Sequence, residues 1–437
     1  MRTYANRSTA LAGLLLLASL ASGCSSIGVK DDAKANSGAA NADAKGNNSI
    51  KLRVMWWGSQ ARHDATLKIL DLYTKKNPNI TFETEYSGYD GYLDKLTTEA
   101  AARNAPDIIQ MDAPWLADWN GRSQLADLSS GINTKDVDTN LLETGKYKGK
   151  LTAVPLGNNA WGMIYDKSAL EKLGVSGPKD GWTWDDYFKI LEELKAKMGK
   201  GQYPAKDGTN DGTMYSAYQL SKGKGWPITQ DGKFNYDRDT WLEWTKKFAD
   251  LRKKGVVPPP DVQLADKDLD PTQDMLLNNQ LIFKGLHAAQ VSAYDSLKPN
   301  SIGVTAVPRG VQPGGWLKAT FYFSVNQDSK YKEESKKFID WFINDPEVGE
   351  IAGTTRGVPI ANKIVSQLQP KFNVGDKLTV EMINKTAVAS QTFNPGAPGW
   401  SDFGKDEKDI KERLMFEKIT PEQSYDELAK AGKKYEK

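Results

Sequence analysis

The sequence predicts an α/β fold with a mainly parallel sheet, and three observations point to that class. Leu52, Val54 and Trp56 alternate at period two, which is typical of a strand. The strand pattern breaks at Gly58, and helical and strand patterns then alternate up to Met111, an order that indicates βαβ units. The 437 residues are too many for one ordinary core. We therefore expect two or three domains.

The predicted elements follow the alternation of apolar residues along the chain. Strands are expected over residues 50–57, 80–86, 106–111, 150–155, 160–165, 281–286, 302–307 and 321–325. Helices are expected from about 62 to 76, then over 92–103, 183–197, 239–254, 271–279 and 330–344. Residues 156–159 interrupt two strands, and we interpret them as the first crossing between two lobes. Residues 199–224 are rich in Gly, Asp and Asn and are expected to be irregular.

The first 48 residues resemble a targeting segment and a tether, not part of a core. Arg2 and Arg7 precede an apolar stretch that is too short to span a bilayer, and small residues lead to Cys24. This pattern is typical of a secretory signal peptide. Residues 25–48 contain few apolar side chains and predict a flexible linker.

Composition excludes several classes of function. Without Arg2 and Arg7, basic and acidic residues balance, which argues against nucleic acid as a partner. Cys24 is the only cysteine, so a disulfide within the chain and a cysteine-based structural zinc site are excluded.

Motifs for catalysis are largely missing from the sequence. There are two histidines, His63 and His287, and the chain has no G-x-S-x-G, H-E-x-x-H or phosphate-loop motif. Paired carboxylates for glycoside hydrolysis stay open, because 56 acidic residues offer many candidates. The spacing D-x-x-N-D-G at residues 207–212 lacks the closing Glu of an EF-hand, so a solvated turn is favoured over a calcium loop.

Aromatic residues give the strongest functional signal in the chain, which has 13 Trp and 17 Tyr. Seven tryptophans lie at predicted strand ends or in Gly/Pro-rich loops: Trp56, Trp57, Trp115, Trp161, Trp226, Trp316 and Trp400. An aromatic ring can cover the apolar C–H face of a sugar while polar side chains bond its hydroxyl groups. For any single tryptophan, core packing is an equally good interpretation. Alternation assigns Trp56 to the core and leaves Trp57 at the rim of a cleft.

Several motifs, in this order and spacing, resemble one family. They are the lipobox-like end at Cys24, W-W-G-S at 56–59, A-P-D-I-I at 105–109, L-A-D-L at 125–128, Y-K-G-K-L-T-A-V-P-L at 147–156, I-Y-D-K at 164–167, T-W-D-D at 183–186 and K-K-F-I-D-W-F at 336–342 before N-D-P. Together they resemble the extracellular solute-binding proteins of ABC transporters, in the large carbohydrate-binding group typified by maltose-binding protein. The lipobox departs from the usual pattern because Ala21 stands where Leu is usual. A simple signal peptide followed by a free cysteine is the alternative.

The resemblance implies a two-lobed fold of the class II type, with two βα domains joined by a hinge and a ligand between them. It assigns 1–23 to a signal peptide, 24–48 to a lipidated Cys24 and linker, 49–157 plus 304–326 to the first lobe, and 158–303 plus 327–437 to the second. It implies a monomer without cofactor or catalysis, anchored by lipid to the extracellular face of a bacterial membrane (in the periplasm of a Gram-negative cell). This monomer would pass a carbohydrate to a permease.

Two other functions remain open. A secreted glycosidase or polysaccharide lyase would turn over the same carbohydrates, and a surface adhesin would bind them without a transporter.

The combination W-W-G-S-Q-x-R-H resembles a branch of the family that handles plant cell-wall oligosaccharides, including pectin-derived ones.

The resemblance also implies a set of ligand-binding residues. They are Trp57, Gly58, Arg62, His63, Tyr89, Asp112, Trp115, Asn159, Trp161, Tyr215, Trp226, His287, Trp316 and Trp400. Asn159 stands where the maltose-binding branch has an acid. Arg62 and His63 form either an exposed first helical turn or a basic pair that meets a uronate carboxylate.

Overall fold

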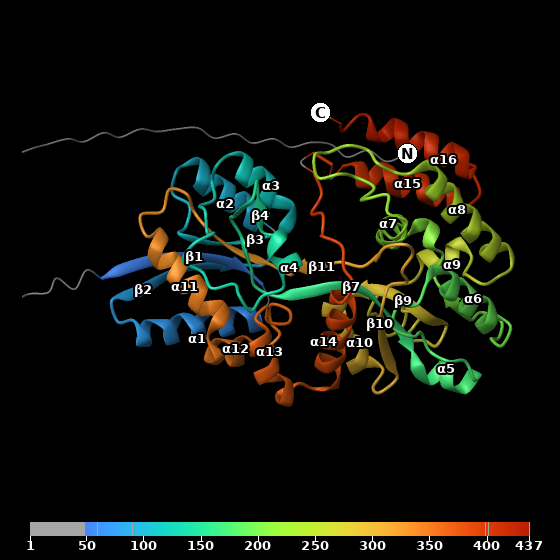
Figure 1. The fold of residues 1–437 in the computed structure, drawn as a ribbon, viewed down its shortest axis with the longest axis horizontal. Coiled ribbons are helices and arrows are strands. Elements are labelled where there is room, and N and C mark those ends of the chain that lie inside the picture. The colour runs from blue at the N-terminus through green and yellow to red at the C-terminus, as the bar shows by residue number, and fades with distance from the viewer. Residues whose placement is uncertain (1–48, 59, 90, 398, 401, 437) are drawn as a thin grey trace, which may run out of the picture. The chain divides into compact units, whose positions relative to one another are not determined.

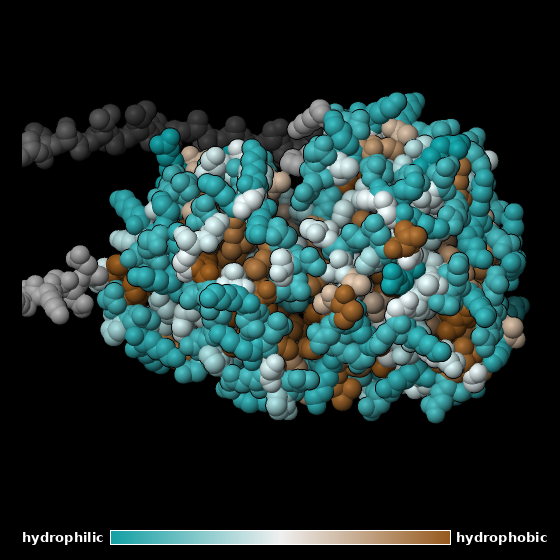
Figure 2. Space-filling model, viewed as in Figure 1, coloured by the Kyte–Doolittle hydropathy of each residue, from teal (hydrophilic) through white to brown (hydrophobic). Residues whose placement is uncertain are grey.

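The computed structural model of the chain describes residues 49–58, 60–89, 91–397, 399–400 and 402–436. The expected signal peptide, the lipidated Cys24 and the linker lie outside the described residues. Within the described part, no helix has both the length and the apolar character needed to cross a bilayer. The face in Figure 2 is mostly hydrophilic, with hydrophobic residues in small scattered groups.

The first sheet has the strand order β2-β1-β3-β12-β6, and its first three strands are labelled in Figure 1. Its strands are β1 (Ile50–Trp57), β2 (Ile80–Ser87), β3 (Ile108–Met111), β6 (Val154–Pro155) and β12 (Tyr322–Val325). β1 is parallel to β2 and β3, whereas β12 is antiparallel to both β3 and β6. The parallel arrangement predicted for the opening βαβ units is confirmed, and the two later strands make the sheet mixed.

Helices cover both faces of this sheet. In Figure 1, α1 (Gln60–Lys76) and α12 (Pro346–Ala352) lie on one side, and α2 (Tyr92–Ala101) and α3 (Ala113–Gly121) lie on the other. Because both faces are covered, both orientations are buried in the second half of β1, from Val54 to Trp57. Trp56 is fully buried and Trp57 is only 4% exposed. The prediction that period two leaves Trp57 at an open rim is therefore wrong.

The second sheet has the order β10-β7-β9-β8, and a short strand, β11, pairs with the start of β7. Its strands are β7 (Asn158–Asp166), β8 (Tyr203–Ala205), β9 (Leu281–His287), β10 (Ile302–Ala306) and β11 (Leu317–Ala319). β7 is antiparallel to β9, β10 and β11, so this sheet is not mainly parallel.

The remaining helices and strands pack around the second sheet or belong to the first lobe. Around the second sheet lie α5 (Lys167–Leu173), α6 (Trp184–Lys195), α7 (Gly212–Ser221), α8 (Arg238–Lys253), α9 (Pro260–Leu264), α10 (Val291–Leu297), α13 (Asn362–Leu368), α14 (Val374–Ala387), α15 (Phe403–Met415) and α16 (Pro421–Gly432). The first core takes in residues of α4 (Thr139–Glu143), β5 (Lys150–Leu151) and α11 (Lys332–Asn344), and β4 (Lys146–Tyr147) pairs with β5.

The chain passes between the two sheets at three places. β6 leads directly into β7, and β11 leads back into β12. After α12, Ile360 packs into the first core and Ala361 into the second. We call residues 49–155 and 322–352 the first lobe and residues 158–319 and 361–436 the second lobe. The crossing predicted at residues 156–159 is the first of the three.

Two of the predicted lobe boundaries are wrong. The prediction put 304–326 in the first lobe, but β10 pairs with β7 in the second sheet. The prediction put all of 327–437 in the second lobe, but Phe338 and Ile339 of α11 belong to the first core. Amphipathic patterns show that a helix has a buried face without showing which sheet it covers.

Three predictions of local structure are also wrong. In each case an aspartate side chain accepts hydrogen bonds from backbone N–H groups or pairs with an arginine. Residues 271–279 form turns and not a helix, since Asp274 accepts bonds from the backbone N–H groups of Leu269, Leu276 and Leu277. The expected irregular stretch 199–224 contains β8 and α7, and Asp211 caps α7 by accepting from the N–H of Met214. Asp207 is buried and paired with Arg252, so it does not lie in a solvated turn.

Candidate functional site

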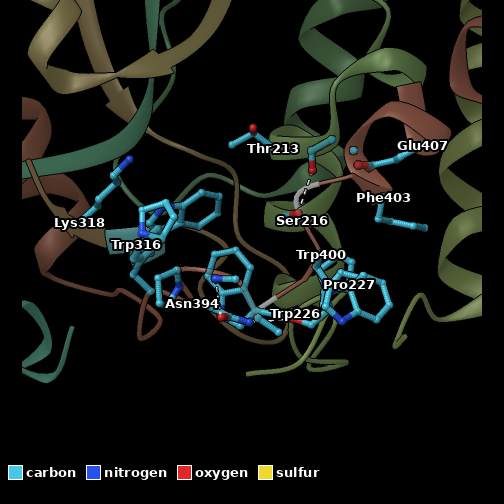
Figure 3. Close-up of a pocket in the computed structure, with 18 of the residues that line it drawn as sticks. Thr213, Ser216, Trp226, Pro227, Trp316, Lys318, Asn394, Trp400, Phe403 and Glu407 are labelled. Atoms are coloured by element: carbon cyan, nitrogen blue, oxygen red, sulfur yellow. Dashed lines mark hydrogen bonds between the residues drawn. The ribbon is translucent and has the colours of Figure 1, made fainter. Parts of the chain in front are cut away.

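A cavity of about 800 Å³ lies between the lobes, and most of its wall comes from the second lobe (Figure 3). Pro114 and Trp115 of α3 are the lining residues of the first lobe. The second lobe contributes the start of α7, residues 226–228, Trp316 and Lys318 around β11, the loop over residues 393–400, and the start of α15. Loops and element ends therefore carry the site, as is usual for binding sites on rigid scaffolds.

Packed tryptophans form one wall of the cavity. Trp226 packs on Trp316 with ring centroids 4.8 Å apart, and Trp161 stacks behind Trp316 at 6.2 Å and an interplanar angle of 10°. The indole N–H of Trp226 donates to the carbonyl of Thr392 at 3.0 Å, which fixes that ring against the loop over 393–400. In Figure 3, Trp316 and Lys318 lie on one side of the cavity, and Phe403 and Glu407 lie on the other.

The first lobe contributes an aromatic cluster to the cleft. Asp112 follows β3 and caps α3 by accepting from the N–H of Ala113, and Pro114 occupies the first turn of that helix. This start of the helix places the ring of Trp115 against Trp57, with 5.0 Å between the ring centroids. Tyr89 stacks on Trp115 with 5.8 Å between the ring centroids and an interplanar angle of 23°. Tyr89 is 53% exposed. The cluster therefore presents rings at its surface and rests on the buried Trp57.

The cavity wall has one lysine and one glutamate among the described residues, and they differ in whether they have a charged partner. The Nζ of Lys318 lies 5.6 Å from the ring centre of Phe393, and among the described residues no carboxylate lies within ion-pair distance of it. Glu407 faces Lys318 from α15 and accepts hydrogen bonds from Lys411 and from the hydroxyl of Tyr236. Although burial opposes the shift, these partners hold the pKa of Glu407 below its usual value. Glu407 is thus a paired carboxylate, whereas Lys318 has no acidic partner in the described part of the chain.

Burial also shifts the pKa values of His287 and Asp112, which lie at or beside the cavity. Burial, with a smaller contribution from the charge of Lys318, lowers the pKa of His287 to about 4, so this imidazole is neutral at pH 7. Its Nδ1 has no hydrogen-bond partner in the part of the chain that the structure describes. Burial raises the pKa of Asp112, although Lys318 and the N–H of Ala113 act in the opposite direction.

The structure brings five of the residues expected at the site to the cavity wall. They are Trp115, Trp226, His287, Trp316 and Trp400. Four more lie directly behind the wall or beside it: Trp57, Tyr89, Asp112 and Trp161.

The other expected residues are used inside the fold. Arg62 donates to the carbonyls of Trp57 and Thr355, and His63 accepts from the indole N–H of Trp56 at 3.1 Å. A Cβ on Gly58 would meet Arg62 at 2.6 Å, so this glycine makes room for the arginine.

Asn159 and Tyr215 are also structural. The side-chain oxygen of Asn159 accepts from the N–H groups of Ala160 and Ala289. Tyr215 is fully buried and donates to Gln219.

Several lining residues were missing from the sequence-based set. They include Pro114, Thr213, Ser216, Lys318, Asn394, Phe403 and Glu407. The Pro- and Gly-containing loop over 393–400 was the available signal for Asn394. Lys318 has no such signal, because only the pairing of β11 with β7 brings it to the cavity.

The arrangement has the features of a ligand-binding site. Among the described residues that line the cavity, Glu407 is the single carboxylate, whereas glycoside hydrolysis ordinarily uses two. The hydroxyl of Ser216 donates to the carbonyl of Gly212, and among the described residues no hydrogen bond joins it to His287. Flat rings with polar groups at their edges match a ligand that has both apolar faces and hydroxyl groups.

Comparison with known proteins finds similarity to bacterial solute-binding proteins. The family model described as "Bacterial extracellular solute-binding protein" matches residues 68–379. The melibiose/raffinose/stachyose-binding protein MelE of Bacillus subtilis is 22% identical over 313 residues, which cover 68% of this chain and 71% of that protein.

Solved structures share the fold. An extracellular solute-binding protein family 1 member from Alicyclobacillus acidocaldarius has a TM-score of 0.79 at 25% identity, and the match covers 89% of this chain and 99% of that one. A periplasmic oligogalacturonide binding protein from Yersinia enterocolitica has a TM-score of 0.75 at 23% identity, with 88% and 98% covered. The second likeness concerns the fold alone.

Proposed function

The chain belongs to the bacterial extracellular solute-binding protein family, and on that premise we propose that it captures an oligosaccharide and delivers it to an ABC importer. The observation that carries the proposal is the tryptophan-lined cavity between the lobes. Its volume of about 800 Å³ is within the usual range for small-molecule sites, and aromatic rings reach it from both lobes. A ligand in contact with both lobes would stabilise their closure, because such a ligand binds the closed state better than the open one.

The sugar specificity of a sequence relative supports an oligosaccharide. MelE is named for melibiose, raffinose and stachyose, and the match to it extends over about two thirds of both chains. Trp115 on one lobe and Trp226 on the other are partly exposed and offer separate ring faces, which suits more than one sugar unit, whereas Trp316 is buried behind Trp226.

We further propose that the ligand carries a carboxylate, as a pectin-derived oligosaccharide of the plant cell wall does. The expected cations for this contact, Arg62 and His63, bond groups inside the first lobe instead. Lys318 is the one lysine or arginine among the described residues that line the cavity, and it has no acidic partner among them, which favours an anionic group on the ligand.

We also propose that the protein is a monomer anchored to the cell membrane. A lipid on Cys24 would tether a monomer to the outer face of the cell membrane, within reach of the permease. Growth in labelled palmitate, compared between the wild type and Cys24→Ala, tests the anchor. Unlabelled wild-type protein would rule it out.

Isothermal titration calorimetry with neutral and uronic oligosaccharides of equal length tests the ligand. We expect one-to-one binding and unchanged sugar on recovery. Binding of neither class would overturn the proposal of an oligosaccharide binder, and equal or tighter binding of neutral sugars would overturn only the carboxylate. Shortened products would favour the alternative, a secreted glycosidase or polysaccharide lyase. If the protein binds the sugar but a strain that lacks the protein still takes up that sugar normally, an adhesin would be favoured.

A further inference from the structure

A second groove lies in the second lobe, apart from the cavity that we assign to the sugar. Its volume is about 390 Å³, which is within the usual range for small-molecule sites. The last turn of α14, with the residues that follow it, forms one wall, and the loop over residues 180–182 forms another. The end of β10 and residues 313–315 complete the lining. Among the described residues, none lines both this groove and the large cavity.

The surface of the groove is mainly apolar. Its apolar side chains are those of Trp182, Val307, Pro313, Val388 and Ala389. Val388 is 89% exposed, so an apolar guest that covers it removes a large apolar area from water. Trp182 is only 5% exposed, and its indole N–H donates to the carbonyl of Ala306. The groove thus offers little ring face on which a sugar would stack, and it suits an apolar guest better than an oligosaccharide.

Backbone hydrogen bonds hold the walls of the groove in place. The N–H of Arg309 donates to the carbonyl of Trp182 at 2.9 Å, and the N–H of Trp184 donates to the carbonyl of Arg309 at 3.2 Å. The N–H of Gln391, shortly after α14, donates to the carbonyl of Gly315 at 2.8 Å. The groove is therefore formed before a ligand arrives, and a preformed site lowers the entropic cost of binding.

One charge in the lining is left without compensation, and it is positive. Lys385 pairs with Asp180 at 2.6 Å and lies 3.7 Å from Glu381, so its charge is balanced. The side chain of Arg309 is exposed, and no carboxylate in the described part of the chain pairs with it. Its Nε reaches the carbonyl of Gly310 only at 3.4 Å, which is long for a hydrogen bond. A guanidinium group in this state is suited to a carboxylate, which it binds through two parallel N–H···O bonds.

We propose that this groove binds a small apolar molecule that carries one carboxylate, such as an arylalkanoic acid. The apolar body contacts Val388 and Pro313, and the carboxylate accepts hydrogen bonds from Arg309. The site is separate from the cavity between the lobes and does not depend on which sugar that cavity takes.

Saturation-transfer NMR with 3-phenylpropionate and its neutral amide, 3-phenylpropionamide, tests the proposal. We expect the acid to bind with a Kd of about 1–10 mM and the amide to bind about tenfold more weakly. Arg309→Gln should weaken binding of the acid about tenfold and leave that of the amide unchanged. Arg122→Gln, which removes an exposed arginine from a surface pair with Asp118, should leave both unchanged. No binding of the acid, or equal binding of acid and amide, would overturn the proposal.

The large cavity is the competing location for the acid, because Lys318 lines it and also attracts carboxylates. Lys318→Gln should therefore bind 3-phenylpropionate as tightly as the wild type does. A loss of binding in Lys318→Gln but not in Arg309→Gln would place the acid in the large cavity and overturn the proposal.

Crystals of the wild-type protein soaked in 3-(4-bromophenyl)propionate supply a test that needs no variant. The expected result is an anomalous peak beside Val388 and Pro313, with the density of the carboxylate within hydrogen-bonding reach of Arg309. Bromine peaks at other positions only, or none at all, would contradict the assignment of the groove.

Discussion

A Cβ on Gly157 would lie 1.7 Å from the carbonyl oxygen of Arg356. Two segments that are about 200 positions apart in the sequence therefore touch backbone to backbone at the boundary between the lobes. The same boundary is held by hydrogen bonds from the N–H of Asn158 to Val358 and from the N–H of Thr320 to the carbonyl of Gly157. Only glycine allows this approach at position 157, so the hinge depends on that residue.

Gly157→Ala should destabilise the protein by about 1–3 kcal/mol, because the added methyl group forces the first and third crossings apart. Urea unfolding measures the loss. Gly121→Ala is the matched control, since a Cβ there meets nothing within 4 Å, and it should leave stability unchanged or slightly raised. Equal stability of the two variants would mean that the crossings separate easily, contrary to the close contact.

The local elements of the fold could be predicted from the sequence, but the placement of several side chains could not. Strand and helix patterns are set by short-range periodicity, and the loop tryptophans Trp226, Trp316 and Trp400 reach the cavity because loops meet there. Arg62 has the same local signal as a ligand-binding residue. It is drawn inward by the carbonyl of Thr355, which is 293 positions away and invisible to local patterns.

Lys318 illustrates the opposite error. It is one of 58 basic residues, and nothing next to it in the sequence distinguishes it. Its position at the cavity results from the register in which Lys318 pairs with Asn159 between β11 and β7. Pairing between segments about 160 positions apart depends on the whole fold, so a pattern over a few residues cannot predict this contact.

Trp226→Ala should weaken oligosaccharide binding at least about tenfold, because it removes a ring face of the cavity and leaves the cavity wider. Trp226 is only partly buried, so the loss of stability should be small. Calorimetric titration gives the affinity. Trp341→Ala removes a partly buried tryptophan from the first lobe, where it packs on Tyr73 far from the cavity lining, and affinity should stay within about twofold. A comparable loss in both variants would contradict the assignment of the site.

The pH dependence of stability should carry a contribution from His287. Its pKa is lowered from 6.5 to about 4 in the folded protein, so the unfolded state binds more protons between these values. Stability is therefore complete above about pH 6.5 and falls as the pH drops towards 4. Between pH 7.5 and 4, the wild type should lose about 2–3 kcal/mol more than His287→Gln does, as measured by urea unfolding. Parallel losses in the two proteins would show that the imidazole is not buried as described.

Lys318→Gln tests the charge of the ligand. A hydrogen bond between Lys318 and a carboxylate is charge-assisted, so its loss should weaken binding of a uronic oligosaccharide by about 10- to 100-fold. Glutamine still donates hydrogen bonds, so binding of a neutral oligosaccharide should change by less than about threefold. Lys385→Gln is a suitable control, because this lysine lies on α14 outside the large cavity and pairs with Asp180. Wild-type affinity for the uronic ligand should also fall with rising salt, and the variant should lose most of that dependence. If Lys318→Gln weakens both ligands equally, the lysine bonds a hydroxyl group common to both sugars, and the preference for a carboxylate has another source or does not exist.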